Sequence, residues 1–477
     1  MRQSTSVVAL AVLAVSACGG DGPTESRSDP GLVFTVGAGT TDTIQASPAQ
    51  PLGIRVIGAD GKPASGAIVR FDAVPAEQNP QVLSMAVGTL ASSGFAQTAL
   101  ETTDASGVAS MRVRFGSAAG EGKIIVTVPE LGFRDTARYT VTPGAAARTA
   151  ISPRDTVVYL DGVVTLRAFV TDRFGNRRSE VPTLTGPEGV SVAGSTVSIS
   201  RFGRHWVRAT FADARADSVG VTALPRGRLA AVRGYYGNML VMMDLDGTNR
   251  ATVPFTGAIY GVDWAPDGRV VLGVAVNGST SSLRAVNPVA VYTFLTGSTA
   301  ASAEFPVFSA DGRSVFFAGR AANTFNSTLW RANADGTGVQ SSAIGLGTNS
   351  GTDYGIAYGP SPDGTKLVSA GTIIDLQTQA RTSLSTPGAA SWRWSPQGDL
   401  IAYNGSSVLG VIKPDGTGRR VLWTGTSSTD QSIDWSGDGK YLVLRGANSL
   451  ALEMVEVASG TRAIVPNTSD FHQGALQ

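Results

Sequence analysis

The chain has 477 residues, and its 58 glycines and low charged fraction of 16% are typical of short strands joined by tight turns. Its 38 basic and 37 acidic residues nearly cancel, which argues against a nucleic-acid-binding protein. A chain of this length is expected to hold about two to four domains. Its single cysteine cannot form an intrachain disulfide, so these domains depend on their hydrophobic cores.

Residues 1–17 predict a secretory signal peptide. Arg2 supplies a positive charge, an apolar run covers 7–15, and two small residues stand before Cys18. The apolar run is far shorter than the ~20 residues that a membrane-spanning helix needs. The sequence therefore predicts export of the chain.

The stretch "VSAC", which ends at Cys18, resembles the lipobox of bacterial lipoproteins. In that family the cysteine thiol receives diacylglycerol, the peptide is cut just before the cysteine, and the new N-terminus is acylated. The resemblance implies cleavage between Ala17 and Cys18 and a stable anchor of several acyl chains. Gly19 and Gly20 follow where an aspartate would favour the inner membrane, which implies the outer membrane. The alternative is ordinary secretion with a stray thiol.

Residues 18–30 are small, polar and proline-containing, and they predict a flexible tether after the lipidated cysteine. From 31 to 144, apolar and polar residues alternate as in strands with one buried face. Leu52, Ile54 and Val56, for example, share one face of such a strand. Seven or so short strands in about 100 residues predict a β-sandwich.

The order of segments in 31–144 resembles the invasin-type bacterial Ig-like domain. The segments that carry the resemblance are "PLGIRV", "DGKPASGAIVRF", "TDASGVASMRV" and the closing "TVTPG". An Ala/Ser/Gln-rich stretch at 75–100 departs from the pattern and predicts an extended loop. Residues 145–225 repeat the theme in a shorter form and predict a second Ig-like domain. Its alternating apolar residues are Val164, Leu166, Ala168 and Val170.

From residue 226 onward the sequence is built from repeats. Five copies of one unit are "VDWAPDGRVV" (262–271), "PVFSADGRSVFF" (306–317), "YGPSPDGTKLVS" (358–369), "WRWSPQGDLIAY" (392–403) and "IDWSGDGKYLVL" (433–444). Copies of a second unit lie at 242–253, 331–341, 411–422 and 455–465, with a weak copy at 373–384 and a further candidate at 293–299. Asp-Gly dipeptides flanked by apolar alternation predict hairpins. Two hairpins make the four-stranded blade of a β-propeller.

The segment 226–477 holds 252 residues, or 42 for each of six second units. It resembles the six-bladed propeller of TolB and its relatives. The first blade begins at "GRLAAV", already in its second strand, so 469–477 is predicted to supply its innermost strand and close the ring. The chain lacks the extra N-terminal domain that TolB carries before its propeller. The resemblance therefore implies the fold and not TolB's role.

Residues for most catalytic or metal sites are scarce. Only His205 and His472 occur, in different predicted domains, which leaves almost no material for a histidine metal site or a Ser-His-Asp triad. "DLDGTN" (244–249) begins like a calcium loop, but Asn249 and Phe255 stand where an EF-hand needs Gly and Glu. We predict no cofactor, no metal and no catalytic residue, and a structural role for the aspartates of the "PDG" turns.

The resemblances together imply a non-catalytic cell-envelope lipoprotein whose Ig-like stalk presents a propeller that binds a protein or an envelope polymer. Invasin-type domains are associated with surface adhesion, and TolB with a peptidoglycan-associated lipoprotein partner. The alternative is an enzyme that processes a glycan or lactone with carboxylates in the propeller channel. Two or more acidic residues converging at the channel mouth would favour that alternative.

The long links between strands predict where a partner binds. If "WSPDG" and "DGT" turns share one rim, the opposite rim carries the loops that vary in length, and variable loops on a rigid scaffold often bind partners. The predicted binding face comprises Tyr235, Tyr236, Arg320, Tyr354 and Arg445. Four tryptophans lie in or beside the predicted innermost strands, namely Trp264, Trp392, Trp394 and Trp435. For these side chains, packing between blades is favoured over stacking against a ligand.

Overall fold

The computed structural model describes residues 29–477 apart from 77–78, 84, 235–236, 278–279, 288–289, 296–299, 322–323, 325, 349–357, 406–407, 425–432 and 447–450. Regular structure in this part of the chain is strand, with one 3-10 turn, η1 (Pro129–Leu131), so the predicted all-β class is confirmed. The described residues contain no helix long and apolar enough to cross a membrane. The predictions at Ala17 and Cys18 lie outside the described residues.

The chain divides into two compact units. One comprises the residues up to Thr149 together with Phe169–Glu180, and the other comprises Ala150–Ala168 with Val181–Gln477.

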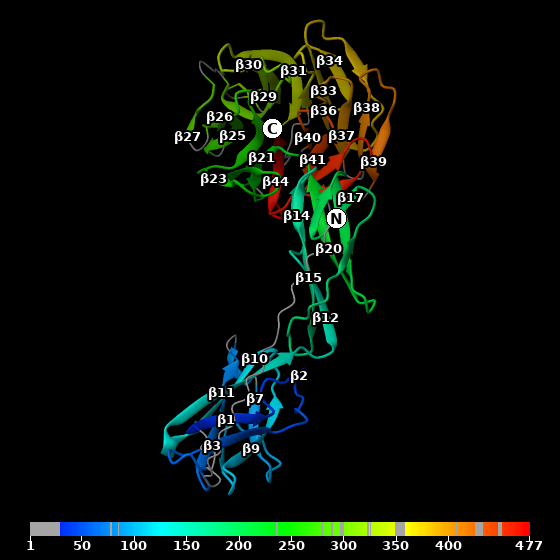
Figure 1. Ribbon diagram of the computed structural model, residues 1–477. Helices are drawn as coiled ribbons and strands as arrows, with labels where there is room; N and C mark the ends of the chain where they lie inside the picture. The colour runs from blue at the N-terminus through cyan, green and yellow to red at the C-terminus, as the bar shows by residue number, and fades with distance from the viewer. Residues whose placement is uncertain are drawn as a thin grey trace, which may run out of the picture. The chain divides into compact units, whose positions relative to one another are not determined.

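The first unit contains two sheets built from the alternating segments of 31–144 (Figure 1). Its strands are β1 (Gly31–Val36), β2 (Thr41–Thr43), β3 (Leu52–Ile57), β4 (Ile68–Ala73), β5 (Pro75–Ala76), β6 (Asn79–Leu83), β7 (Met85–Thr89), β8 (Thr98–Thr102), β9 (Val108–Phe115), β10 (Gly120–Val128) and β11 (Phe133–Thr142). One sheet has the order β1-β3-β9-β7 and the other β2-β11-β10-β4-β8, with β5 and β6 as a separate pair.

Both sheets bury one face in a common core. Ile54 and Val56 on β3 are fully buried and contribute to the same core as Phe71 on β4, whereas Arg55 between them is exposed. This is the period-two pattern of a half-buried strand.

One prediction in this region is wrong. The stretch 75–100 is not an extended loop, because it contains β5, β6, β7 and the start of β8. Met85 and Val87 on β7 are fully buried and pair with β9. Small and polar residues dominate the composition of the stretch and conceal these two alternating apolar residues.

Nine strands follow the first two sheets. They are β12 (Ala146–Ser152), β13 (Thr156–Tyr159), β14 (Val163–Thr165), β15 (Arg167–Asp172), β16 (Thr183–Thr185), β17 (Val190–Ala193), β18 (Thr196–Ile199), β19 (Gly203–Thr210) and β20 (Ala216–Leu224). Their sheet orders are β12-β15, β13-β20-β19-β16 and β14-β18-β17. Leu166 and Val170, two of the predicted alternating residues, are 1% exposed.

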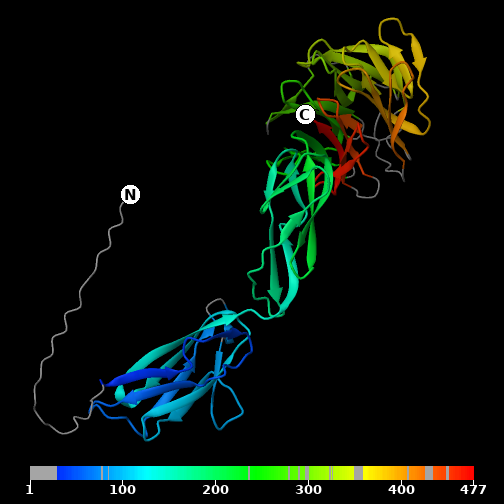
Figure 2. The same cartoon turned by 45° about the vertical axis from the view of Figure 1, so that its right-hand side comes forward.

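The rest of the second unit is a propeller (Figures 1 and 2). Its strands are β21 (Arg228–Arg233), β22 (Met239–Asp244), β23 (Ala251–Pro254), β24 (Ile259–Trp264), β25 (Val270–Asn277), β26 (Thr280–Asn287), β27 (Ala290–Thr293), β28 (Ser302–Phe308), β29 (Ser314–Arg320), β30 (Asn326–Asn333), β31 (Gln340–Thr348), β32 (Tyr358–Pro360), β33 (Lys366–Ser369), β34 (Thr372–Asp375), β35 (Arg381–Ser383), β36 (Ala389–Trp394), β37 (Ile401–Gly405), β38 (Val408–Ile412), β39 (Arg420–Thr424), β40 (Ile433–Trp435), β41 (Tyr441–Arg445), β42 (Leu452–Glu456), β43 (Arg462–Ile464) and β44 (Phe471–Leu476).

The described part of this segment forms six four-stranded antiparallel sheets, which confirms the predicted blades. The first blade is β23-β22-β21-β44, and the others follow in chain order as β24–β27, β28–β31, β32–β35, β36–β39 and β40–β43. The "PDG" turns join the first and second strands of blades two to six, and the "DGTN" turn joins β22 to β23. Since neighbouring strands run antiparallel, both kinds of turn lie on one rim of the propeller.

The last strand closes the ring as predicted. β44 pairs with β21, with Leu229 opposite Leu476 and Ala230 opposite Ala475. In Figure 1, β44 (red) lies beside β21 (green) although more than 200 residues separate them in the chain. The innermost strand of the first blade therefore comes from the end of the sequence.

The second unit also contains a core to which residues that precede the propeller strands contribute together with propeller residues. Phe202 and Leu224 belong to the same buried cluster as Tyr441 and Val443 on β41. The ring centroids of Phe202 and Tyr441 are 5.0 Å apart. Residues that precede the propeller strands in this unit thus pack directly against the first and last blades.

Candidate channel-mouth site

The repeat places one residue of each blade at an equivalent point on its innermost strand. In β24 this residue is Asp263, which precedes Trp264 and pairs with Val271. We call it the ring position. In blade order, the residues matched to it by strand pairing are Ala475, Asp263, Val307, Gly359, Arg393 and Asp434.

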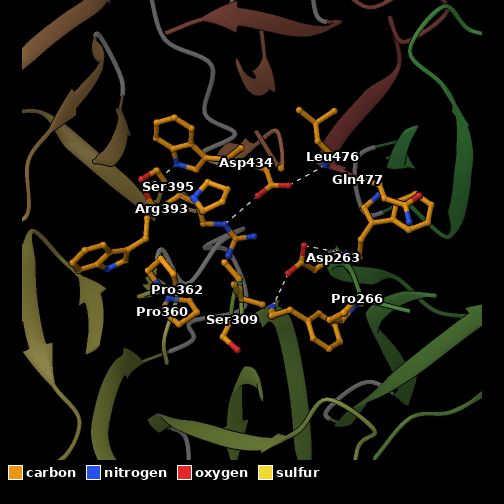
Figure 3. A pocket seen from close by; sticks show the side chains of 18 of the residues that line it. Asp263, Pro266, Ser309, Pro360, Pro362, Arg393, Ser395, Asp434, Leu476 and Gln477 are labelled. Atoms are coloured by element: carbon orange, nitrogen blue, oxygen red, sulfur yellow. Dashed lines mark hydrogen bonds and ion pairs between the residues drawn. The ribbon is translucent and has the colours of Figure 1, made fainter. Parts of the chain in front are cut away.

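A cavity of about 310 Å³ lies where the innermost strands meet, at the rim that carries the "PDG" turns (Figure 3). Residues of β24, β28, β32, β36, β40 and β44 all line it, so it lies on the propeller axis. Its charged side chains are Asp263, Arg393 and Asp434. Four prolines also line it, namely Pro266, Pro360, Pro362 and Pro396. We call this space the channel-mouth cavity.

Both aspartates hydrogen-bond to the following blade. Asp263 accepts the backbone N–H of Trp264 at Oδ1 (3.0 Å) and that of Phe308, on β28, at Oδ2 (2.7 Å). Asp434 accepts the backbone N–H of Leu476, on the closing strand, at Oδ2 (2.9 Å). These bonds join neighbouring blades and hold each carboxyl group in one orientation at the cavity wall.

Arg393 partly compensates the two carboxyl groups. Its Nε lies 3.5 Å from Oδ1 of Asp434, and each of these side chains is 14% exposed. Burial raises the pKa of both aspartates, and the charge of Arg393 opposes the rise. Asp434 adds to the rise at Asp263, whose pKa reaches about 7. The carboxyl group of Asp263 therefore keeps its proton to a higher pH than an exposed aspartate does.

Three tryptophans follow the ring position and line the cavity. The indole Nε1 of Trp264 donates to the carbonyl of Ala475, and that of Trp435 donates to the carbonyl of Arg393, each over 3.1 Å. Each of these rings is thus pinned to the preceding blade. The Nε1 of Trp394 is buried and has no acceptor among the described residues. A buried donor without an acceptor is unfavourable unless a ligand or water supplies one.

The cavity therefore has unused hydrogen-bonding capacity of both kinds. A carboxylate oxygen can accept two bonds, and a guanidinium has five N–H groups. Within the described residues, each oxygen of Asp263 has one donor, and the guanidinium of Arg393 has Asp434 as its single partner. The same residues include no group of three or more His, Cys, Asp or Glu side chains that could hold a metal ion.

Two residues of the predicted binding face are described, and neither lines the cavity. Arg320 ends β29 and Arg445 ends β41, both at the strand end away from the "PDG" turn. Arg320 donates to Ser302 (3.0 Å) and lies 3.4 Å from Oε1 of Glu304, and Nη1 of Arg445 lies 3.0 Å from Nδ1 of His472. The other three predicted residues lie outside the described part, namely Tyr235, Tyr236 and Tyr354. This face stays a prediction.

The predicted structural role of the "PDG" aspartates is confirmed. Oδ1 of Asp267 accepts the backbone N–H of Arg269 (3.1 Å) within its own turn, and equivalent turn bonds involve Asp311, Asp363 and Asp438. Packing between blades is also confirmed for Trp264, Trp392 and Trp435, which are at most 7% exposed and lie in clusters that join adjacent blades.

The motifs alone do not single out Asp263, Arg393 and Asp434. Their signal is a charged residue directly before tryptophan in "DWAP", "RWSP" and "DWSG". That residue stands within a predicted strand, where a charge is costly unless it is paired or serves a site.

No protein-family model and no curated protein matches the chain. Similar solved structures include TolB from Acinetobacter baumannii, at 16% identity over 63% of this chain and 83% of that one, with a TM-score of 0.42. A nidogen/laminin complex matches at 12% identity over 53% and 98% of the two chains, with a TM-score of 0.39. XC5397 from Xanthomonas campestris, described as a gluconolactonase, matches at 14% identity over 56% and 93%, with a TM-score of 0.35. The propeller assignment rests on the strand pairing of this chain itself.

Proposed function

We propose that the chain is a non-catalytic binding protein of the cell envelope, in which the propeller binds a partner at the channel-mouth cavity. One observation carries the proposal: all six innermost strands line a cavity whose three charged groups are already oriented. Hydrogen bonds from the next blade hold Asp263 and Asp434 in place. A site that needs little rearrangement loses little free energy in binding its ligand.

The N-terminal sequence supports a location of the propeller in the cell envelope. We propose that residues 1–17 are removed, that Cys18 carries the lipid anchor, and that the anchor lies in the outer membrane. Residues 31–144 and 145–225 are proposed as Ig-like domains, the first of invasin type. The two-sheet core of the first unit supports a sandwich there. In this arrangement the sandwiches act as a stalk between lipid and propeller.

Capture of a partner from solubilised envelope tests this function, with protein and glycan mass spectrometry as the readout. Gly437 lines the cavity, and an added Cβ there meets no atom within 4 Å, so Gly437→Trp adds a large side chain at the cavity lining without a clash at its Cβ. Gly345 on β31 is equally open, and Gly345→Trp is the matched control. We expect Gly437→Trp to lose the partner and Gly345→Trp to retain it.

Capture that persists in Gly437→Trp would place the binding face elsewhere. The variant for that outcome carries alanine at the five residues of the binding face predicted from the sequence, namely Tyr235, Tyr236, Arg320, Tyr354 and Arg445. Loss of the partner in this variant alone, with unchanged melting, would support the opposite rim and overturn the cavity.

A second candidate function is an enzyme that processes a glycan or lactone. The observation that favours it is the convergence of Asp263 and Asp434 on one cavity. With a pKa of about 7, Asp263 suits general acid–base catalysis near neutral pH. Turnover of a panel of aryl glycosides and sugar lactones tests it. If the native chain turns over a substrate and Gly437→Trp does not, the chain is an enzyme that acts at this cavity. Equal turnover by the two proteins would contradict catalysis at the cavity.

A further inference from the structure

The polar groups of the channel-mouth cavity define the chemistry that fits it. Arg393 offers N–H donors beyond its contact with Asp434, and Trp394 offers a buried indole N–H without an acceptor among the described residues. Asp263 offers carboxyl oxygens that each hold one donor. Asp263, Arg393 and Trp394 all line the same space. A hydroxyl group donates and accepts at once, so it can satisfy both kinds of group.

The charges of the cavity favour a neutral ligand. Arg393 and Asp434 form an ion pair, and in the described structure Asp263 has no basic side chain within ion-pair distance. Its carboxyl group instead accepts two backbone N–H groups. Burial and the nearby Asp434 raise the pKa of Asp263 and so favour its neutral form, in which the charges of the cavity balance. A charged ligand would then add a buried charge without a partner, which is costly, whereas a neutral polar ligand leaves the balance unchanged.

The walls of the cavity suit a small ring with apolar faces. Trp264, Trp394 and Trp435 line it together with prolines of the turns. A few oriented polar groups among aromatic walls are typical of specific small-molecule sites, and a volume of about 310 Å³ is near the lower end of their size range. The space admits a single small ring more readily than a folded peptide segment.

We infer that the channel-mouth cavity binds one neutral, hydroxyl-rich sugar unit, whose hydroxyl groups bond to Asp263, Arg393 and the indole of Trp394. The inference rests on the proposed function, since it names the partner chemistry of the same cavity. A free saccharide and the end of an envelope glycan share this chemistry.

Calorimetric titration of the full chain tests the inference. The neutral probes are glucose, galactose and N-acetylglucosamine, and the charged probes are glucosamine and glucuronate. We expect at least one neutral sugar to bind, with affinity at least tenfold above that of its charged counterpart. Gly437→Trp should weaken this binding at least tenfold and Gly345→Trp should leave it unchanged. Arg393→Lys should also weaken it at least tenfold, because lysine keeps the charge but loses the planar donor fork.

The outcomes separate this inference from the proposed function. Stronger binding of glucosamine or glucuronate than of any neutral sugar would overturn the inference and indicate an ion site. Absence of binding to every probe, with envelope capture still lost in Gly437→Trp, would overturn the sugar assignment and leave the binding function intact. If Gly437→Trp retains both sugar binding and envelope capture, the sugar inference and the proposed function are both overturned. If a β-linked disaccharide binds more tightly than its monosaccharide, the ligand is the end of a glycan. If the two bind equally, the ligand is a free saccharide.

Discussion

At the scale of single residues, Asp263 combines two tasks that usually belong to different side chains. It lines the cavity, and it joins the second blade to the third through the N–H of Phe308 (2.7 Å). Its other oxygen accepts the N–H of Trp264. Because each oxygen accepts a backbone N–H, the position requires two acceptor oxygens, which an amide side chain cannot supply.

The first prediction follows from those two bonds. In Asp263→Asn the amide presents one oxygen and one NH₂ group, so one backbone N–H faces another donor. We expect the free energy of unfolding to fall by about 1–3 kcal/mol, the typical cost of an unsatisfied buried group. Urea denaturation measures it. The control is Asp438→Asn, in an exposed turn that asparagine also stabilises, and an equal loss in both variants would contradict the argument.

The second prediction concerns pH. The pKa of Asp263 is raised to about 7 in the folded protein, above the ~3.9 of an unfolded chain. Between these values the folded state binds more protons than the unfolded state, so this residue's contribution to stability falls as pH rises from about 4 to 7. The difference in unfolding free energy between the native chain and Asp263→Asn should therefore shrink over that range. A difference that grows with pH would show that the pKa is lowered instead.

At the scale of elements, the closing strand decides whether the propeller is a ring. β44 supplies Phe471, which is fully buried, and Leu476, whose N–H bonds to Asp434 of the last blade. It also pairs with β21 along its length. The strand therefore contacts both blades at the seam and contributes to the wall of the cavity.

The third prediction is that removing 469–477 opens the propeller. The loss exposes the apolar faces of the first and last blades and the unpaired edge of β21. Buried aromatic side chains contribute about 3–5 kcal/mol each, so we expect Tm to fall by more than about 10 °C, with aggregation. Calorimetry of the truncated chain, compared with Ile464→Ala on an exposed part of β43, measures this. A Tm within about a degree of the parent would rule out a closing role.

At the scale of the whole molecule, the second unit is held together by more than its blades. Phe202, 5% exposed, lies in a cluster with Leu224 and with Tyr441 of the last blade. Near this cluster, Gly203 adopts a φ of 111°, and a Cβ there would lie 2.8 Å from the Cγ2 of Thr461 on the adjoining blade. Residues that precede β21 and residues of the propeller thus share one core in this unit.

The fourth prediction tests that shared core. Phe202→Ala should lower the unfolding free energy of the second unit by about 3–5 kcal/mol, because it leaves a cavity between sandwich and blade. Ile464→Ala is the control, since its side chain is 51% exposed, and its loss should stay below about 1 kcal/mol. Equal losses would mean that Phe202 does not join the two parts.

The fifth prediction concerns the anchor. Cys18→Ser removes the thiol that would be acylated, so the variant should leave the membrane fraction and appear in the soluble fraction. Labelled palmitate should enter the native chain and not the variant. Continued sedimentation of the variant with membranes, together with absence of label in the native chain, would refute the lipobox interpretation.

Most of the fold can be predicted because its strands and turns depend on residues that are close together in the sequence. Alternation such as Leu52, Ile54 and Val56 reports a half-buried strand, and Asp-Gly pairs report hairpins, because both depend on neighbours a few residues away. Even the closing strand is predictable, because the first blade begins without an innermost strand. The stretch 75–100 escaped prediction because its buried Met85 and Val87 stand among small polar residues.

The blades, their turns and the closure of the ring thus follow from the amino-acid pattern alone. The candidate site depends on the tertiary fold, because Asp263, Arg393 and Asp434 come from three different blades and meet only when the ring closes around its axis. Their chemistry also depends on that closure. Burial and the nearby charges set the pKa of Asp263, and neither exists in an isolated strand, where the same carboxyl group would be solvated and fully ionised at neutral pH.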